Sequence, residues 1–287
     1  MRGRVMKSKY LPYLLILPAI VYLLFFIGYP LVQAIILAFT HNGHLSLYNF
    51  RSALATPTFI PAFKYTLALA AVIIPTQLFL ALILSLIMTR TFKGKDMVLY
   101  ALIIPLTISD VAGGLIWYTL LSDAGFLNKL LINIGLISQP IHFFGYQYRN
   151  MEFLAIVLEE LWRSTAIVFV IILAGMQMIS KEYIEAAEVF GAGYWTRLRK
   201  IIIPMLKPSI QSALIIRTLF AMQIFGAVWM LAGRDIPVLA GEGYYQLTFI
   251  RNYGVASIYA LAIAALSIVL GALYVKFLKA PYLEVSR

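Results

Sequence analysis

The stretch YLPYLLILPAIVYLLFFIGYPLVQAIILAFT, residues 10–40, contains no charged side chain. A helix needs about 20 mostly apolar residues to cross a hydrocarbon core of about 30 Å. A helix also satisfies its own backbone hydrogen bonds, which lipid cannot do for it. This run is longer than the apolar region of a signal peptide and has no small-residue cleavage pattern behind it. We therefore expect residues 10–40 to remain in the protein as a membrane-spanning helix.

The rest of the chain has the same apolar character. Hydrophobic residues make up 62% of the 287 positions and charged residues 12%, and the mean hydropathy is +0.89. Soluble domains are only about half apolar, and a globule of about 300 residues buries only about three quarters of its unfolded surface. The excess apolar surface must therefore face lipid.

Five further segments are long and apolar enough to span a membrane. Segments 65–89 and 252–275 carry no charge. Segment 97–122 carries Asp110, segment 153–179 carries Glu159, Glu160 and Arg163, and segment 208–233 carries Arg217. The alternating pattern of a β-barrel is absent. The sequence thus predicts an all-α integral membrane protein, a six-helix bundle that forms a single transmembrane domain over residues 1–287.

The lysines and arginines of the connecting segments predict the orientation. With the N-terminus in the cytoplasm, the inner segments hold fifteen of them and the outer segments six. Cytoplasmic loops carry the excess of positive charge in membrane proteins. We therefore expect a multi-pass protein of the cell membrane with both termini cytoplasmic, and we attribute the net charge of +11 to this topology rather than to nucleic-acid binding.

Several kinds of chemistry are not supported by the residues present. The chain has no cysteine, so it forms neither disulfides nor thiolate sites. His41 and His44 lie in a predicted outer loop far from His142, which does not suggest a metal site. Lys93 to Asp96 does not fit the spacing of a nucleotide-binding P-loop. We expect no enzyme activity, no cofactor and no metal in this chain.

The predicted cytoplasmic loop 180–204 contains two short amphipathic helices. Ser180 can cap a helix that runs toward Val189, and Gly191 can end it. A second stretch places Trp195 and Leu198 at helical spacing among basic residues, and Pro204 is expected to stop it. From spacing alone, two interpretations remain open: an interfacial elbow that contacts lipid head groups, or a surface that docks another protein.

The segment EYIEAAEVFGAGYWTRLRKIIIPMLKP, residues 182–208, resembles the EAA loop of binding-protein-dependent ABC importers. The residues that match the loop pattern are Glu185, Ala186, Ala187, Gly191, Ile201 and Pro204. Residues 105–131 and 161–180 are similar to the third and fourth spans of the maltose, glycerol-phosphate and multiple-sugar permeases, of the first-permease type. The chain departs from the family at Phe190, where an acid is frequent, and at Gly226, where an acid commonly follows Phe225.

The resemblance implies a mechanism and a set of partners. In that family the EAA helix sits in a groove of a cytoplasmic ATPase, which binds ATP and Mg²⁺, and closure of the ATPase dimer opens the permease outward. It also implies a second permease subunit and an extracytoplasmic solute-binding protein. The residues fit these roles, because Ala186 and Ala187 permit close approach, Glu185 can accept charge-assisted hydrogen bonds, and Gly191 allows a turn.

Charged residues inside spans are the remaining candidates for function, because they are costly in lipid and usually face the bundle interior or a water-filled path. We select Asp110, Glu160, Trp162 and Arg163 as candidates for the translocation path. Glu159 or Glu160 can also pair with Arg163 along one helix face, which is a purely structural role. Arg217 is expected to be structural, with its long side chain reaching toward the membrane surface.

These observations predict the permease subunit of an ABC importer that moves a sugar or oligosaccharide into the cytoplasm, driven by a separate ATPase. Import of another polar solute, such as a glycerol phosphate or a polyamine, is an alternative. A carrier that uses intramembrane acids as ion sites is a further one. A receptor or scaffold that only signals would show no solute flux.

Overall fold

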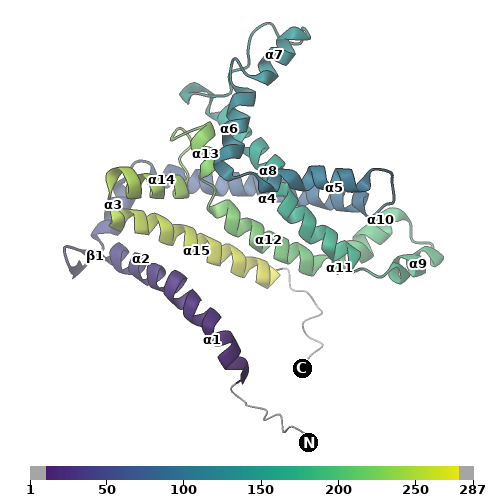
Figure 1. Ribbon diagram of the computed structural model, residues 1–287, viewed down its shortest axis with the longest axis horizontal. Coiled ribbons are helices and arrows are strands. Elements are labelled where there is room, and N and C mark those ends of the chain that lie inside the picture. Colours follow the sequence, from purple (N-terminus) through teal and green to yellow (C-terminus); the bar gives the residue numbers. More distant parts are fainter. Residues whose placement is uncertain (1–10, 278–287) are drawn as a thin grey trace, which may run out of the picture.

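The computed structural model describes residues 11–277, and these residues are almost entirely helical (Figure 1). The described strands, β1 (Thr40–His41) and β2 (His44–Leu45), pair antiparallel. They are joined by Asn42 and Gly43, whose φ angles of 51° and 81° are those of a two-residue hairpin turn. Tyr10 and the terminal basic residues that contribute to the predicted orientation, Arg2, Arg4, Lys7, Lys9, Lys279 and Arg287, lie outside the described residues.

The helices follow one another with short connections. In chain order they are α1 (Leu11–Leu23), η1 (Leu24–Gly28), α2 (Tyr29–Phe39), α3 (Tyr48–Ala55), α4 (Phe59–Met88), α5 (Lys95–Ile103), η2 (Ile104–Thr107), α6 (Asp110–Leu121), α7 (Phe126–Asn133), η3 (Tyr146–Tyr148), α8 (Arg149–Gln177), α9 (Lys181–Val189), α10 (Tyr194–Arg197), η4 (Leu198–Ile202), α11 (Ile203–Met205), α12 (Lys207–Met222), α13 (Gly226–Leu231), α14 (Leu239–Tyr245), η5 (Gln246–Ile250) and α15 (Tyr253–Phe277).

Three helical stretches of the described chain are long and apolar enough to cross a membrane: 11–39, α4 and α15. A fourth is added if the bent pair formed by Lys95–Thr107 and Asp110–Asn133 counts as one span. Helix α8 is 29 residues long but carries several charges, and α12 has only 16 residues. The described chain is therefore a multi-pass helical bundle, and the number of six spans stays a prediction.

Two of the predicted spans, 97–122 and 208–233, are interrupted rather than continuous helices. The first bends by 105° between Thr107 and Asp110, and α6 begins where the Ser109 hydroxyl accepts a hydrogen bond from the Ala112 N–H at 3.2 Å. The second is interrupted after Met222, and α13 begins at Gly226. Each break leaves backbone groups that the surrounding protein must satisfy.

Helices α4, α8 and α12 form the centre of the bundle (Figure 1). Ile73, Ile156 and Met222 are fully buried where these helices meet α13. A second apolar cluster includes Phe169 and Leu206 and continues along the same helices toward α9. In lipid such packing is driven by van der Waals contact, so these clusters fix the relative positions of α4, α8 and α12.

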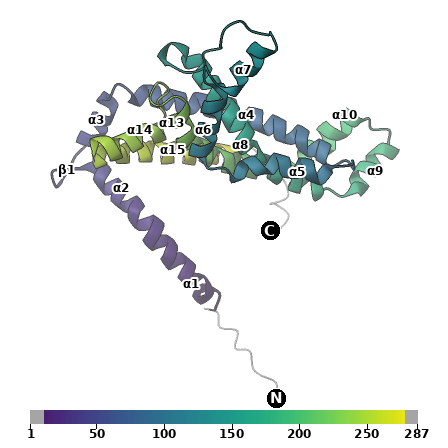
Figure 2. The same ribbon diagram turned by 45° about the horizontal axis from the view of Figure 1, so that its top comes forward.

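The N-terminal helical stretch diverges from this body. Helix α2 packs against α15 at one end, whereas α1 extends away, as both views show (Figures 1 and 2). No residue of α1 is buried, although the helix is wholly apolar. A surface of this kind must be covered by lipid or by another membrane chain.

Candidate functional site

Helix α9 is a short exposed helix with defined ends. The Ser180 hydroxyl accepts a hydrogen bond from the Glu182 N–H at 3.3 Å, which confirms the predicted cap. At the other end Gly191 has a φ of +78°, its N–H bonds the Glu188 carbonyl, and the Ala192 N–H bonds the Ala187 carbonyl. This is a Schellman motif, in which a glycine takes the left-handed position. The prediction that Gly191 ends the helix is confirmed.

The residues that match the EAA pattern lie on this helix and on the segment after it. Glu185 and Ala186 are exposed in the middle of α9, beside half-buried Ala187. Val189 and Phe190 at the tip are 87% and 90% exposed. The helix lies at one end of the elongated body, on the right in Figure 1, and α3 and α14 lie at the opposite end. Exposed apolar groups of this kind are typical of a surface that contacts another protein or a membrane.

The segment after α9 folds back on it. Arg197 forms an ion pair with Glu188, which closes the turn between α9 and α10. Helix α10 leads into η4, a π-helix that contains Ile201, and then into α11, which contains Pro204. The prediction that Pro204 stops this stretch is wrong. The wider π-turn bonds the Ile203 N–H to the Leu198 carbonyl, and this shift of register accommodates the proline.

A second group of functional candidates is a buried ion network, formed by Asp110, Glu159, Glu160, Arg163 and Arg217 together with Gln77. Arg163 contacts all three carboxylates: Nε lies 2.8 Å from Glu159, and Nη2 lies 2.6 Å from Glu160 and 2.7 Å from Asp110. The predicted pairing of Glu159 and Glu160 with Arg163 is therefore confirmed. Asp110 joins them because the bend before α6 turns its side chain toward α8.

Glu160 links the two arginines of the buried ion network. Its second oxygen accepts a hydrogen bond from Arg217 Nη2 at 2.5 Å, and Arg217 Nε bonds the Gln77 side-chain oxygen. The Gln77 amide in turn donates to the Glu160 carbonyl at 2.7 Å. The Arg217 side chain is only 2% exposed, so the expectation that it reaches the membrane surface is wrong. The paired carboxylate holds it inside, where α4, α8 and α12 meet.

Asp110 also holds the break between α12 and α13. Its Oδ2 accepts the Gly226 N–H at 2.6 Å, so one carboxylate bonds both Arg163 and the first residue of α13. A Cβ at position 226 would lie 2.8 Å from that oxygen and 2.9 Å from Val111 Cγ2. Only glycine fits this approach of α13 to α6, which gives a physical reason for the glycine that departs from the family pattern.

The remaining candidate for the translocation path lies apart from the network. The Trp162 ring packs near the Trp117 ring, at 6.2 Å between centroids, and is partly exposed. The structure thus brings together Asp110, Glu160 and Arg163 but not Trp162. Direct contact of any of these residues with a solute stays a prediction.

The three acids of the network are close enough together to resemble a metal site, with ligand atoms within 4.8 Å of one another. Arg163 occupies the position between them that a cation would need. Three carboxylates and two guanidinium groups leave little excess negative charge, so ion pairing accounts for the cluster.

One polar cluster was missed by the sequence analysis. Glu242, almost fully buried in α14, binds Arg234 through both oxygens at 2.9 Å and accepts the Thr58 hydroxyl at 2.6 Å. The Arg234 guanidinium also lies over the Tyr245 ring. The hydrogen bonds that Arg234 donates to Glu242 raise the pKa of Arg234, which therefore stays charged. The sequence offers only an isolated acid, Glu242, in the loop between the predicted spans 208–233 and 252–275.

Comparison with known proteins covers nearly the whole chain. Residues 54–280 match the family described as "Binding-protein-dependent transport system inner membrane component". The chain is 30% identical over 286 residues to the trehalose transport system permease protein SugA of Mycobacterium tuberculosis, with 96% of this chain and 90% of the relative covered. It is 28% identical over 283 residues to the trehalose/maltose transport system permease protein MalF of Thermococcus litoralis, with 92% of each covered.

The fold is also similar to a solved structure. A chain of a bacterial ABC transporter involved in the import of the acidic polysaccharide alginate superposes with a TM-score of 0.79 at 21% identity, covering 95% of this chain and 96% of that one. At this identity the likeness concerns the fold.

Proposed function

The chain belongs to the family of binding-protein-dependent transport system inner membrane components, and from this premise we propose that it is the permease subunit of an ABC importer for a sugar or oligosaccharide. The main observation that supports the proposal is the exposed helix α9. It ends in a left-handed turn at Gly191, and the apolar side chains of Val189 and Phe190 are exposed at that end. A permease needs such an element because it binds no nucleotide itself.

In this proposal α9 docks in a cytoplasmic ATPase that forms a dimer, and ATP and Mg²⁺ bind there. Glu185 accepts hydrogen bonds from the ATPase, and Ala186 and Ala187 allow it to approach the helix closely. Phe190, which stands where relatives often have an acid, inserts into an apolar part of the docking groove. Ile201 and Pro204 then hold the segment that returns to the membrane.

The position of α9 between two central helices supports this role. Helix α8 ends at Gln177, just before α9, and α12 begins at Lys207, just after α11. Both central helices contribute to the buried ion network, through Glu160 and Arg163 on α8 and Arg217 on α12. A displacement of α9 would therefore act on the two helices that this network locks together, which is how a distant site can shift a two-state bundle.

The topology and partners follow from the same proposal. Both termini lie in the cytoplasm, and α9 lies on that side, opposite α3 and α14. A second permease subunit covers part of the apolar surface that α1 leaves exposed. An extracytoplasmic solute-binding protein delivers the sugar to the opposite face, and Trp162 and the buried ion network line or gate the path between the two permeases.

Uptake into proteoliposomes tests this function. The chain is reconstituted with the second permease and the ATPase, with ATP and Mg²⁺ in the lumen and the binding protein and labelled trehalose or maltose outside. We expect accumulation that requires luminal ATP and persists when an ionophore collapses all ion gradients. Loss of uptake on adding the ionophore, with ATP intact, would indicate an ion-coupled carrier, and the absence of flux of both sugars would exclude these two as substrates.

A further inference from the structure

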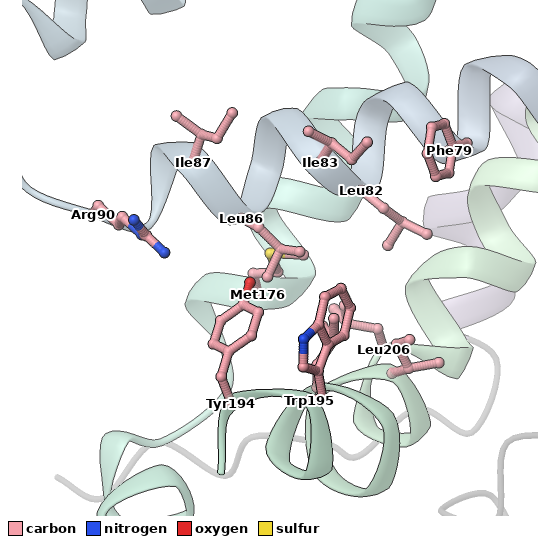
Figure 3. Close-up of a pocket in the computed structure, with 12 residues that line it drawn as sticks. Phe79, Leu82, Ile83, Leu86, Ile87, Arg90, Met176, Tyr194, Trp195 and Leu206 are labelled. Atoms are coloured by element: carbon pink, nitrogen blue, oxygen red, sulfur yellow. The ribbon is translucent and has the colours of Figure 1, made fainter.

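A deep groove lies between the last turns of α4 and the segment α10–η4. Its volume is about 460 Å³ and its walls are almost entirely apolar, with Ile83 and Ile87 on one side and Leu198 on the other. Figure 3 shows the side chains of α4 along one side, with Tyr194 and Trp195 facing them across the space. We call this feature the α4 groove. Its lining includes no residue of the buried ion network and neither Val189 nor Phe190.

One end of the α4 groove is basic. Arg90, the second residue after α4, lies at that end in Figure 3, and Phe79 lies near the other. Among the ion pairs of residues 11–277, none involves Arg90. Lys93 and Lys95 follow before the first acid of this segment, Asp96. The end of the groove therefore carries positive charge that no acid among the described residues pairs with.

The α4 groove lies at the level of the membrane surface. Helix α4 has 30 residues and is about 45 Å long at 1.5 Å per residue, which exceeds a hydrocarbon core of about 30 Å. The uncharged run 65–89 ends directly before Arg90, which indicates that the last turn of α4 lies near the head groups on the side of α9. Tyr194 and Trp195 are residue types that concentrate at this level, with their rings in the apolar region and their polar atoms in the wet one.

We propose that the α4 groove binds one anionic phospholipid of the surrounding bilayer, with its phosphate on Arg90 and an acyl chain along Ile87 and Ile83. Basic clefts between transmembrane helices on the cytoplasmic side are suited to anionic head groups. A protein helix is a poor fit, because a helix about 10 Å across would place only about one turn in 460 Å³. The bound lipid would connect α4 to the segment that returns from α9.

Site-specific fluorescence quenching tests this binding, because the chain has no cysteine of its own. An Ile83→Cys variant, labelled with bimane, is assembled with its partner subunits in phosphatidylcholine nanodiscs. A minor fraction of either dibrominated phosphatidylglycerol or dibrominated phosphatidylcholine is then included as quencher. We expect the affinity of the groove for the anionic lipid to be about fivefold higher than for phosphatidylcholine. This ratio corresponds to about 1 kcal/mol, the usual contribution of one basic residue to binding at an anionic membrane surface.

Two further variants complete the design. Arg90→Gln in the labelled chain should make the two brominated lipids quench equally, whereas Lys93→Gln, an exposed residue three positions on that does not line the groove, should preserve the difference. Equal quenching by both lipids in the parent, or a difference that survives Arg90→Gln, would overturn the proposal. Absence of quenching by either lipid would also overturn it and would indicate that a protein chain fills the groove. The result does not depend on which solute is transported.

Discussion

Replacing Gly191 by proline is expected to abolish solute uptake by the assembled importer while leaving insertion of the chain intact. Proline fixes φ near −65°, whereas Gly191 has a φ of +78°, and the substitution also removes the N–H that bonds the Glu188 carbonyl. A penalty of about 3 kcal/mol or more would disfavour the native turn by at least ~100-fold. The measurement is sugar uptake in proteoliposomes, with ATP hydrolysis recorded in parallel.

Gly193→Ala provides the matched control. Gly193 lies two residues further on, has an ordinary φ of −66°, and has no atom within 4 Å of the position that a Cβ would take. We expect this variant to transport like the parent. Normal uptake by Gly191→Pro would show that the left-handed turn at the end of α9 is not needed for coupling.

Replacing Arg217 by methionine is expected to destabilise the folded bundle by about 3–5 kcal/mol, the usual cost of removing one partner of a buried ion pair. Arg217 is almost fully buried and bonds both Glu160 and Gln77. Without it, Glu160 keeps only Arg163 as a charged partner, and the network gains a net negative charge in the apolar interior. Thermal unfolding of the purified chain in detergent measures the loss.

A double variant separates the contribution of the Glu160–Arg217 ion pair to stability from the contributions of the two side chains individually. Changing Glu160 to Gln in the Arg217→Met background removes the uncompensated charge, so it should restore part of the lost stability. With the Glu160→Gln single variant measured as well, the coupling energy of the two residues is the loss in the double variant minus the sum of the two single losses. If instead the two losses simply add, the contact between α8 and α12 does not depend on this ion pair.

Much of the fold could be predicted from the sequence because lipid imposes simple constraints. The uncharged run 10–40 and the uncharged segment 65–89 correspond to helical stretches of matching character, 11–39 and α4. Ser180 and Gly191 predict the two ends of α9 correctly, since capping depends on only a few neighbouring residues.

The breaks in the helices could not be predicted in the same way. An apolar run has the same composition whether the helix is straight or bent, so the sequence did not reveal the 105° bend before Asp110 or the interruption after Met222. Tertiary contacts decide both, because Asp110 satisfies the Gly226 N–H at the second break. The prediction that Pro204 ends the helix was wrong for a related reason. The π-helix before it accommodates the proline, and the spacing of apolar residues does not predict a π-helix.

In the candidate site, too, the sequence predicts contacts within one helix but not contacts between helices. Spacing along one helix correctly predicted that Glu159 and Glu160 pair with Arg163, because charged residues inside a membrane protein tend to pair with one another. Sequence spacing could reveal only the partners on the same helix. The contacts from Arg217 and Gln77 to Glu160 join residues more than 50 positions apart, and they exist only once α4, α8 and α12 have packed.

The central claim, that the tip of α9 is where the ATPase docks, is tested most directly by protection of a single cysteine. In nanodiscs, a Phe190→Cys variant is treated with a membrane-impermeant maleimide, with and without the ATPase subunit, and Phe126→Cys, an exposed position on α7, serves as the control. We predict that the ATPase protects the cysteine at position 190 and leaves the one at 126 equally reactive. Equal labelling at position 190 in the presence of a bound, active ATPase would contradict the account.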